Sequence, residues 1–235
     1  MVNSMNKSKI ITFVILRFLA IFLFFISFFD QYVGTIFYFT VQSNILVIIV
    51  LLILNIYDIL KLQNKINSMP NFIYRLKYIS VVGISLTFLI FGLILTPIIV
   101  FKTDYPFYVL SISSLSMHLI IPIISILDWF VNDYLKNPRL PSFLIPLTFP
   151  LYYLGFAMTC SVVGVKYKDF FNMDVDNHVP YFFLDYKKYG WFKIKLDQGL
   201  FGFGVVYWIV GIAILVTFIS FIYLYIKKLS LKNKK

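Results

Sequence analysis

The sequence predicts an all-α membrane protein, a single bundle of six transmembrane helices over residues 1–235. Three observations support this prediction. The composition is 60% hydrophobic and 20% aromatic, with only 13% charged residues, whereas soluble proteins are about 45–50% apolar and about 25% charged. Six long apolar runs follow one another along the chain. Each is close to the roughly 20 residues that an α-helix needs to cross about 30 Å of hydrocarbon.

The six apolar runs give the expected spans. Backbone groups in hydrocarbon have to pair within their own segment, and the runs are too long and continuous for barrel strands. We therefore expect helices from Ile10 to Phe29, Thr35 to Leu60, Tyr78 to Phe101, Phe107 to Phe130, Phe143 to Val163 and Leu200 to Ile226. The only long connection is 164–199, and its aromatic part is expected to lie at the interface or to dip back toward the bundle.

The distribution of Lys and Arg predicts the orientation of these spans. The side with both termini and the second and fourth loops holds 13 basic residues and three Asp, whereas the other side holds seven Lys and seven Asp. We therefore expect both termini to be cytoplasmic, the protein to lie in the plasma membrane, and loop 164–199 to be extracytoplasmic. The net charge of +11 then reflects topology, so we expect no nucleic-acid partner.

Few residues are suited to binding metals, cofactors or other chains. The single cysteine, Cys160, excludes an internal disulfide and a thiolate cluster. His118 has no second His, Glu or Cys at ligand spacing, so we expect no metal and no cofactor. The expected partners are membrane lipids. Gly202, Gly204 and Gly211 in the last run fit close helix approach, within this chain or in a homo-oligomer.

A polar stripe opens the second run. Residues three and four apart share a helix face, so Thr40, Ser43 and Asn44 lie together. Gln42 is rotated away from Thr40 by about 200 degrees. An unpaired polar group in lipid is costly, so the stripe predicts a functional site. The alternative is that these groups bond across helices or back to preceding carbonyl groups.

The fourth run has a polar face of its own. Ser111, Ser114, His118, Pro122 and Ser125 follow at helical spacing. Pro122 has no N–H to donate to the His118 carbonyl, so we expect a kink that leaves this carbonyl free. A kink can hold the imidazole over a cavity, and imidazole exchanges a proton readily near neutral pH. The alternative is a buried neutral histidine that is hydrogen-bonded to a serine.

Two further places are expected to be structural. Arg17 lies about 10 Å from the cytoplasmic start of its helix. There it can reach lipid phosphates or pair with Asp58 or Asp128. Asp128 and Trp129, at the end of the fourth run, fit an anchor at the membrane interface.

The long loop carries an aromatic segment, His178 to Asp185, which is followed by Tyr189–Trp191. Aromatic residues with Pro and Gly suit a rigid turn at the level of the lipid headgroups. The functional alternative is a cap that shapes a substrate entrance from the outer leaflet, with Pro180, Tyr181 and Asp185 as its entrance residues.

Together these features resemble a known family. Arg17, the Tyr38–Asn44 opening of the second span, His118 with Pro122, and the segment that ends at Phe183–Asp185 are similar to bacterial predicted six-transmembrane proteins. Those proteins are related to the androgen-induced-gene and androgen-dependent TFPI-regulating protein family. Its eukaryotic members are intramembrane threonine hydrolases that cleave fatty acid esters of hydroxy fatty acids. The resemblance covers nearly the whole chain in architecture and about a dozen residues in motif.

The resemblance implies a catalytic pair, with Thr40 at the position of the family's nucleophile and His118 at that of its histidine. A threonine hydroxyl needs a neighbouring base, so the pair should lie within about 3 Å. Ser43, Asn44 and Ser114, or a free main-chain N–H near the kink, would then contact the oxyanion or the substrate. Helical rise places Thr40 about 8 Å and His118 about 16 Å from the extracytoplasmic edge. Ser43 is therefore the substitute nucleophile if Thr40 is out of reach.

Three functions remain open on the sequence. An intramembrane hydrolase of lipid esters predicts a cavity lined by Thr40, Ser43, Asn44 and His118. A small transporter or binding protein for a lipid or another hydrophobic molecule predicts a cavity without chemistry. Ion transport is disfavoured, because no acidic residue lies deep in a span. A non-catalytic membrane scaffold would use the polar stripes only to join helices.

Overall fold

In the part of the chain that the structure describes, six helices are long and apolar enough to cross a membrane. The computed structural model describes residues 4–30, 33–66, 69–102, 106–132, 141–168, 176–195 and 202–232. The spans within them are Lys7–Phe29, Phe39–Leu62, Asn71–Phe101, Ile112–Val131, Ile145–Val163 and Val205–Ser230. The prediction of an all-α bundle with six spans is therefore confirmed, and the chain is a multi-pass membrane protein.

The spans consist of regular α-helices with shorter segments at their ends and inside two of them. The long helices are α1 Ser4–Phe29, α2 Phe39–Leu62, α3 Asn71–Ile90, α6 Ile121–Val131, α7 Thr148–Val163 and α9 Val205–Lys232. Shorter helical segments are η1 Val33–Phe37, η2 Phe91–Leu95, α4 Thr96–Lys102, η3 Pro106–Leu110, α5 Ile112–Leu115, η4 Ser116–Ile120, η5 Ile145–Leu147, η6 Phe182–Leu184 and α8 Tyr186–Tyr189. A two-stranded antiparallel pair, β1 Tyr167–Lys168 with β2 Asp176–Asn177, lies in the long loop.

All six spans begin at residues other than those expected, and for three of them the local reason is clear. A 3₁₀ segment precedes α2, and Tyr38 before Phe39 is extended. In the fourth span the Ser111 side chain accepts the main-chain N–H of Ser114 and so caps α5. The third span starts earlier than expected, directly after Pro70, since proline is well tolerated at a helix start. Lys77 therefore belongs to α3 and not to a loop.

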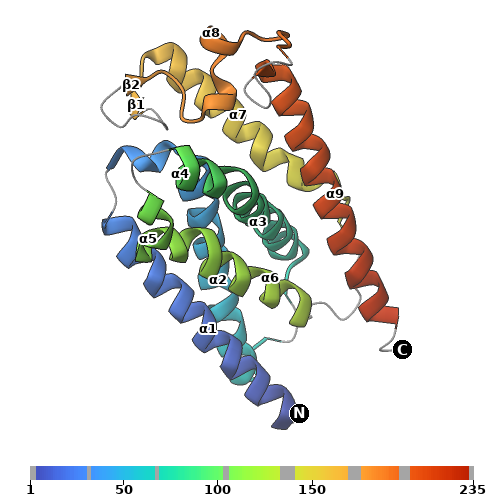
Figure 1. Ribbon diagram of the computed structural model, residues 1–235. Helices are drawn as coiled ribbons and strands as arrows, with labels where there is room; N and C mark the ends of the chain where they lie inside the picture. The colour runs from blue at the N-terminus through green and yellow to red at the C-terminus, as the bar shows by residue number, and fades with distance from the viewer. Residues whose placement is uncertain are drawn as a thin grey trace.

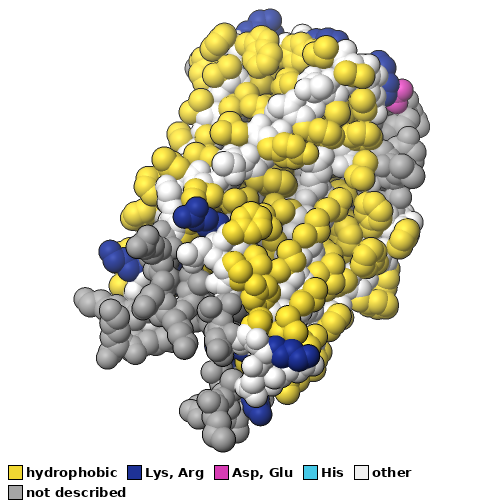
Figure 2. Space-filling model, turned by 180° about the vertical axis from the view of Figure 1, so that it is seen from behind, with side chains coloured by type: hydrophobic (Ala, Val, Ile, Leu, Met, Phe, Trp, Pro, Cys, Tyr) yellow, Lys and Arg dark blue, Asp and Glu magenta, His cyan; other side chains and the backbone are white. Residues whose placement is uncertain are grey.

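Helix α3 is central to the bundle, because it contacts α2, α6, α7 and α9. Helix α1 packs against α2, α5 and α6 on one side, and α7 and α9 cover the other side (Figure 1). The start of α1 and the end of α9 lie at one end of the bundle, and α8, β1 and β2 lie at the other. Figure 2 shows one face covered largely by apolar side chains, with Lys and Arg mainly toward its two ends. This distribution suits a protein surrounded by lipid.

Part of the long loop lies inside the bundle. The segment from Val179 to Leu184 is buried and belongs to the same apolar core as residues of α3, α7 and α9. Trp191 further along is 43% exposed. Of the two expectations for the aromatic part of the loop, dipping back toward the bundle is therefore confirmed for 179–184.

The glycines before α9 serve the loop and not helix packing. Gly202 and Gly204 precede Val205, the first residue of α9. A Cβ atom at Gly202 would meet the main chain of Lys195, and one at Gly204 would meet that of Trp191. Both glycines thus let 202–204 lie directly against 191–195, where Ile194 and Phe203 form a β-bridge. The predicted role of these two glycines in helix approach is wrong.

A buried charge cluster joins five helices near the ends of α2 and α6; it consists of Arg17, Asp58, Lys77, Asp128 and Lys227. Arg17 is fully buried and pairs with Asp58 at 2.7 Å and with Asp128 at 2.6 Å. Lys77 pairs with the other oxygen of Asp128, also at 2.6 Å. The expectation that Arg17 pairs with Asp58 or Asp128 is confirmed for both. Buried charges need such partners, since leaving water is otherwise too costly.

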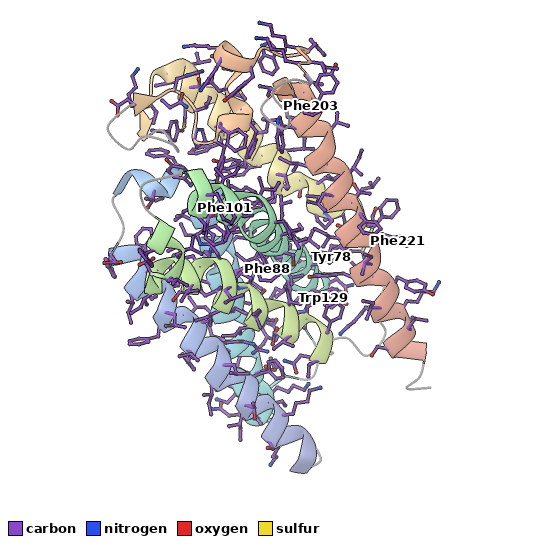
Figure 3. All side chains as sticks on the ribbon, viewed as in Figure 1. Tyr78, Phe88, Phe101, Trp129, Phe203 and Phe221 are labelled. Carbon is purple, nitrogen blue, oxygen red and sulfur yellow. The ribbon has the colours of Figure 1, made fainter. Side chains whose placement is uncertain are left out.

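The interface anchor expected at the end of the fourth span is wrong. Asp128 and Trp129 are both fully buried. The Trp129 ring stacks on Tyr78 of α3, with ring centroids 5.2 Å apart (Figure 3). The ammonium groups of Lys77 and Lys227 lie 5.9 and 5.6 Å from its centre. Trp129 packs inward because its ring faces two cations as well as an aromatic partner.

Arg17→Met should destabilise the bundle strongly. The change leaves the buried carboxylate of Asp58 without its guanidinium partner, and loss of one member of a buried pair costs about 3–5 kcal/mol. The free energy of unfolding in detergent micelles measures this effect. Lys7→Met on the exposed surface of the same helix is the control and should change little. Equal stability of the two variants would contradict the assigned role of the cluster.

Candidate functional site

The polar stripe at the start of α2 is tied to its own first turn and to α3. The Ser43 hydroxyl lies 2.9 Å from the Thr40 carbonyl oxygen, to which it donates. It also lies 2.9 Å from the hydroxyl oxygen of Thr87 in α3. The Asn44 amide donates to the same Thr40 carbonyl at 2.8 Å. Thr40 is therefore held in place through its main chain, while its hydroxyl takes no part in these bonds.

Asn44 also connects the stripe to the fourth span. Its side-chain nitrogen donates to the main-chain oxygen of Met117 at 3.1 Å, and Met117 directly precedes His118. One amide nitrogen thus bridges the carbonyl groups of Thr40 and Met117. Helical rise alone suggested different depths in the membrane for Thr40 and His118, because that estimate assumes that both helices begin at the same depth. The bridge shows that the main chain at Thr40 and the main chain at Met117 lie at a similar depth in the bundle.

Two π-helical segments lie beside this bridge, and each has a proline in the same relative position. Segment η2 spans Phe91–Leu95 and precedes Pro97, and η4 spans Ser116–Ile120 and precedes Pro122. In each case the residue just before the proline donates its N–H to the carbonyl five residues back. The wider turn accommodates the proline, which has no N–H to donate to a carbonyl in the preceding turn. The kink expected at His118 therefore takes the form of a π-helical turn, a feature often found at functional sites.

His118 lies in η4 with a defined tautomer. Its Nδ1 lies 2.9 Å from the main-chain oxygen of Ser114. A carbonyl oxygen only accepts, so Nδ1 carries the hydrogen and Nε2 of the neutral ring is left as an acceptor. The imidazole stacks on Phe91 of η2, with ring centroids 3.6 Å apart and planes inclined by 13°. The two π-helical segments are thus joined through these rings.

A cavity of about 90 Å³ lies between the start of α2, the end of α3 with η2, α7, α9 and the loop segment around η6. Thr40 lines it, and further hydroxyl groups come from Thr87, Tyr153 and Tyr181. All other described residues in its wall are apolar, and Phe91 is one of them. The cavity therefore suits a hydrophobic ligand with a small polar group.

Of the four polar residues expected to line a cavity, the structure places Thr40 in its wall. Ser43 and Asn44 lie behind Thr40 and bind its carbonyl. His118 is not among the described lining residues and reaches the cavity wall through Phe91. Ser114 is fully buried and contributes its carbonyl to His118.

The loop contributes Tyr181 to the cavity. Its side chain is 9% exposed and lies edge-on to Tyr38 and nearly parallel to Phe183. Burial raises the pKa of Tyr181 to about 12, and the neighbouring Thr40 and Phe39 oppose this shift. The phenol is therefore protonated at neutral pH.

The other two expected entrance residues have different surroundings. Pro180 is buried next to Tyr181. The Asp185 side chain accepts the main-chain N–H of Lys188 at the start of α8 and lies 3.5 Å from His178. Partial burial lowers the pKa of His178, although the Asp185 carboxylate opposes this shift. Asp185 thus holds the loop in shape, and Tyr181 is the entrance residue that reaches the cavity.

Three residues of the site escaped the sequence analysis, namely Thr87, Phe91 and Tyr153. The signal for Phe91 was available, because Pro97 follows it at the same distance as Pro122 follows Ser116. Thr87 and Tyr153 lie in long, mostly apolar runs. Their sequence context does not show which helix they face.

Comparison of the chain with protein families, curated proteins and solved structures finds no match. The resemblance to the androgen-induced-gene family therefore stays a prediction.

Asn44→Leu should destabilise the contact between α2 and η4. Leucine has a similar size but cannot bridge the carbonyl groups of Thr40 and Met117, and a buried polar group left without its partner costs about 1–3 kcal/mol. The free energy of unfolding in micelles is the measurement. Gln42→Leu is the matched control, because among the described residues the Gln42 amide makes one hydrogen bond, a 3.4 Å contact with the Ile36 carbonyl. A smaller loss for Asn44→Leu than for Gln42→Leu would contradict the bridge.

Proposed function

We propose that the protein is an intramembrane hydrolase of lipid esters, with Thr40 as nucleophile and His118 as general base. The observation that carries the proposal is a mostly apolar cavity with Thr40 in its wall. The Asn44 amide joins the Thr40 carbonyl to that of Met117, in the turn that holds His118. The volume of about 90 Å³ is that of roughly three water molecules. It is enough for the ester group and a few carbon atoms, while the remaining acyl chain lies in the bilayer.

In the first half of the reaction the Thr40 oxygen attacks the ester carbonyl carbon, and its proton passes to Nε2 of His118. The carbonyl electron pair moves onto oxygen and forms a tetrahedral oxyanion. Collapse of this intermediate breaks the bond to the alcohol oxygen, which takes the proton from His118 as it leaves. The products of this half are the free alcohol and an acyl ester of Thr40.

In the second half a water molecule attacks the acyl group on Thr40 and gives its proton to His118. Collapse of the second tetrahedral intermediate releases the carboxylic acid and returns the proton to the Thr40 oxygen. The bond from Nδ1 of His118 to the Ser114 carbonyl supports both halves, because it keeps the acceptor nitrogen on the opposite side of the ring. Ser114 thus fills the orienting role that a carboxylate has in a catalytic triad.

Phe91 lies between His118, the proposed base, and the cavity. It stacks on His118 and lines the cavity. In the proposed reaction the Phe91 ring shifts when substrate binds, so that Nε2 of His118 reaches the Thr40 hydroxyl. The adjacent π-helical segment η2 is the element that accommodates this shift, because its hydrogen bonding is less regular than that of an α-helix.

A second candidate function is the binding or transfer of a hydrophobic molecule without chemistry. The observation that favours it is that His118 is outside the described lining of a mostly apolar cavity. Transfer of a fluorescent fatty acid ester between vesicles, with the ester intact and with equal rates for wild type and His118→Ala, would support this function over hydrolysis.

Thr40→Ala and His118→Ala should each abolish hydrolysis of a fatty acid ester of a hydroxy fatty acid by the protein in proteoliposomes. Removal of either partner leaves no activated nucleophile, so the expected loss is at least about 1,000-fold. The amount of free fatty acid released is the measurement. A fluorophosphonate probe should label the wild type but not Thr40→Ala.

The control for these variants is Thr159→Val. Thr159 is an exposed residue of α7 whose hydroxyl bonds to the Gly155 carbonyl. It lies outside the described cavity wall. This variant should hydrolyse ester and accept the probe like the wild type. Hydrolysis by Thr40→Ala at the wild-type rate would disprove the proposed nucleophile.

We also propose that the protein lies in the plasma membrane with both termini in the cytoplasm. The support is the excess of Lys and Arg on the side of the termini. Lys65 and Lys193 are exposed and lie on opposite sides in this arrangement. In a Cys160→Ala background, Lys193→Cys should react with a membrane-impermeant thiol reagent on intact cells. Lys65→Cys should react only after the cells are permeabilised, and the reverse pattern would invert the topology.

A further inference from the structure

We propose that the Tyr181 hydroxyl is the oxyanion donor of the site, hydrogen-bonding to the substrate oxygen that becomes negatively charged when Thr40 attacks. The inference rests on the proposed hydrolase function and adds a catalytic residue to it. The resemblance to known proteins implies only a threonine and a histidine, and the sequence analysis left the oxyanion donor open among Ser43, Asn44, Ser114 and a main-chain N–H. The structure argues against the first three.

The three side chains considered first are already used in other ways. The Ser43 hydroxyl bonds to the Thr40 carbonyl and to Thr87. The Asn44 nitrogen bridges two carbonyl oxygens. Neither residue lines the cavity, and fully buried Ser114 does not line it either. An oxyanion donor has to reach the reacting oxygen directly, so these residues do not meet the geometric requirement.

Tyr181 meets this requirement. It lines the same cavity as Thr40, so the two side chains border one space of about 90 Å³. The carbonyl oxygen of an ester bound for attack by Thr40 is one bond away from the carbon that Thr40 approaches. A donor in the wall of the same small cavity is therefore also within reach of that oxygen.

The hydrogen-bonding capacity of the phenol supports a donor role. The hydroxyl groups of Thr87 and Tyr153, which also line the cavity, already bond to Ser43 and to the Phe37 carbonyl. A phenol hydroxyl has one hydrogen that it can donate. Because the pKa of Tyr181 is about 12, that hydrogen is present at neutral pH.

The Tyr181 ring is held rigidly, as an oxyanion donor needs to be. It stacks on Phe183 with centroids 5.1 Å apart and planes inclined by 7°. Tyr38 and Tyr153 meet it at 5.7 and 6.3 Å. These contacts fix the ring without using its hydroxyl, so the donor is oriented before substrate binds. This role also explains why the loop reaches back into the bundle.

The test compares Tyr181→Phe with the wild type, Thr40→Ala and His118→Ala in proteoliposomes that contain a fatty acid ester of a hydroxy fatty acid. Phenylalanine keeps the ring packing and removes only the hydroxyl. Loss of one oxyanion donor lowers kcat about 100- to 1,000-fold, so kcat should fall by at least about 100-fold while KM changes little. Tyr78→Phe is the matched control, since Tyr78 is a buried tyrosine outside the cavity whose hydroxyl donates to the Ser220 carbonyl.

The outcomes separate the two proposals. A large fall in kcat for Tyr181→Phe, with KM and the unfolding temperature close to those of Tyr78→Phe, supports the oxyanion role. If Tyr181→Phe stays as active as Tyr78→Phe while Thr40→Ala and His118→Ala are inactive, the oxyanion role is wrong and the hydrolase proposal stands. A rise in KM without a fall in kcat also overturns the oxyanion role. If no hydrolysis depends on Thr40, both proposals fail.

Discussion

Polar groups removed from water need partners within the protein, and this constraint organises both ends of the bundle. At one end, Arg17 pairs with Asp58 and Asp128, and Lys77 binds the second oxygen of Asp128. At the other end, Asn44 bridges two carbonyl groups from different helices. In both places the bonds that satisfy buried polar groups also fix neighbouring helices against each other. The candidate site depends on this second set of bonds for its position.

Proline adds a local departure from the regular helix at the point where the site is built. The N–H groups missing at Pro97 and Pro122 coincide with two π-helical turns, and these turns meet through the stacked rings of Phe91 and His118. A wider turn changes the direction of the side chains that follow it. The arrangement connects a potential base to the cavity wall by a single aromatic ring, so the position of that ring governs contact between the base and a ligand.

The sequence predicted the surroundings of a polar residue correctly where its position on a single helix was enough to indicate them. Arg17 is the only basic residue deep in an expected span, so its pairing with a carboxylate could be predicted. The joint placement of Thr40, Ser43 and Asn44 followed from helical spacing. Lys77 was missed because it lies at the edge of an apolar run, where hydropathy does not separate a buried charge from one in a loop. Trp129 was placed at the interface because its two cationic neighbours come from other helices.

By itself, the sequence determined the six spans and the polar faces, because hydrophobic length and helical periodicity are local properties. Only the tertiary structure decided which faces meet. It placed Phe91 against His118, put Ser43 and Asn44 behind Thr40, and brought Tyr181 from a distant loop into the cavity. These contacts join segments far apart in the chain, and their geometry depends on how side chains of several helices fill the same volume.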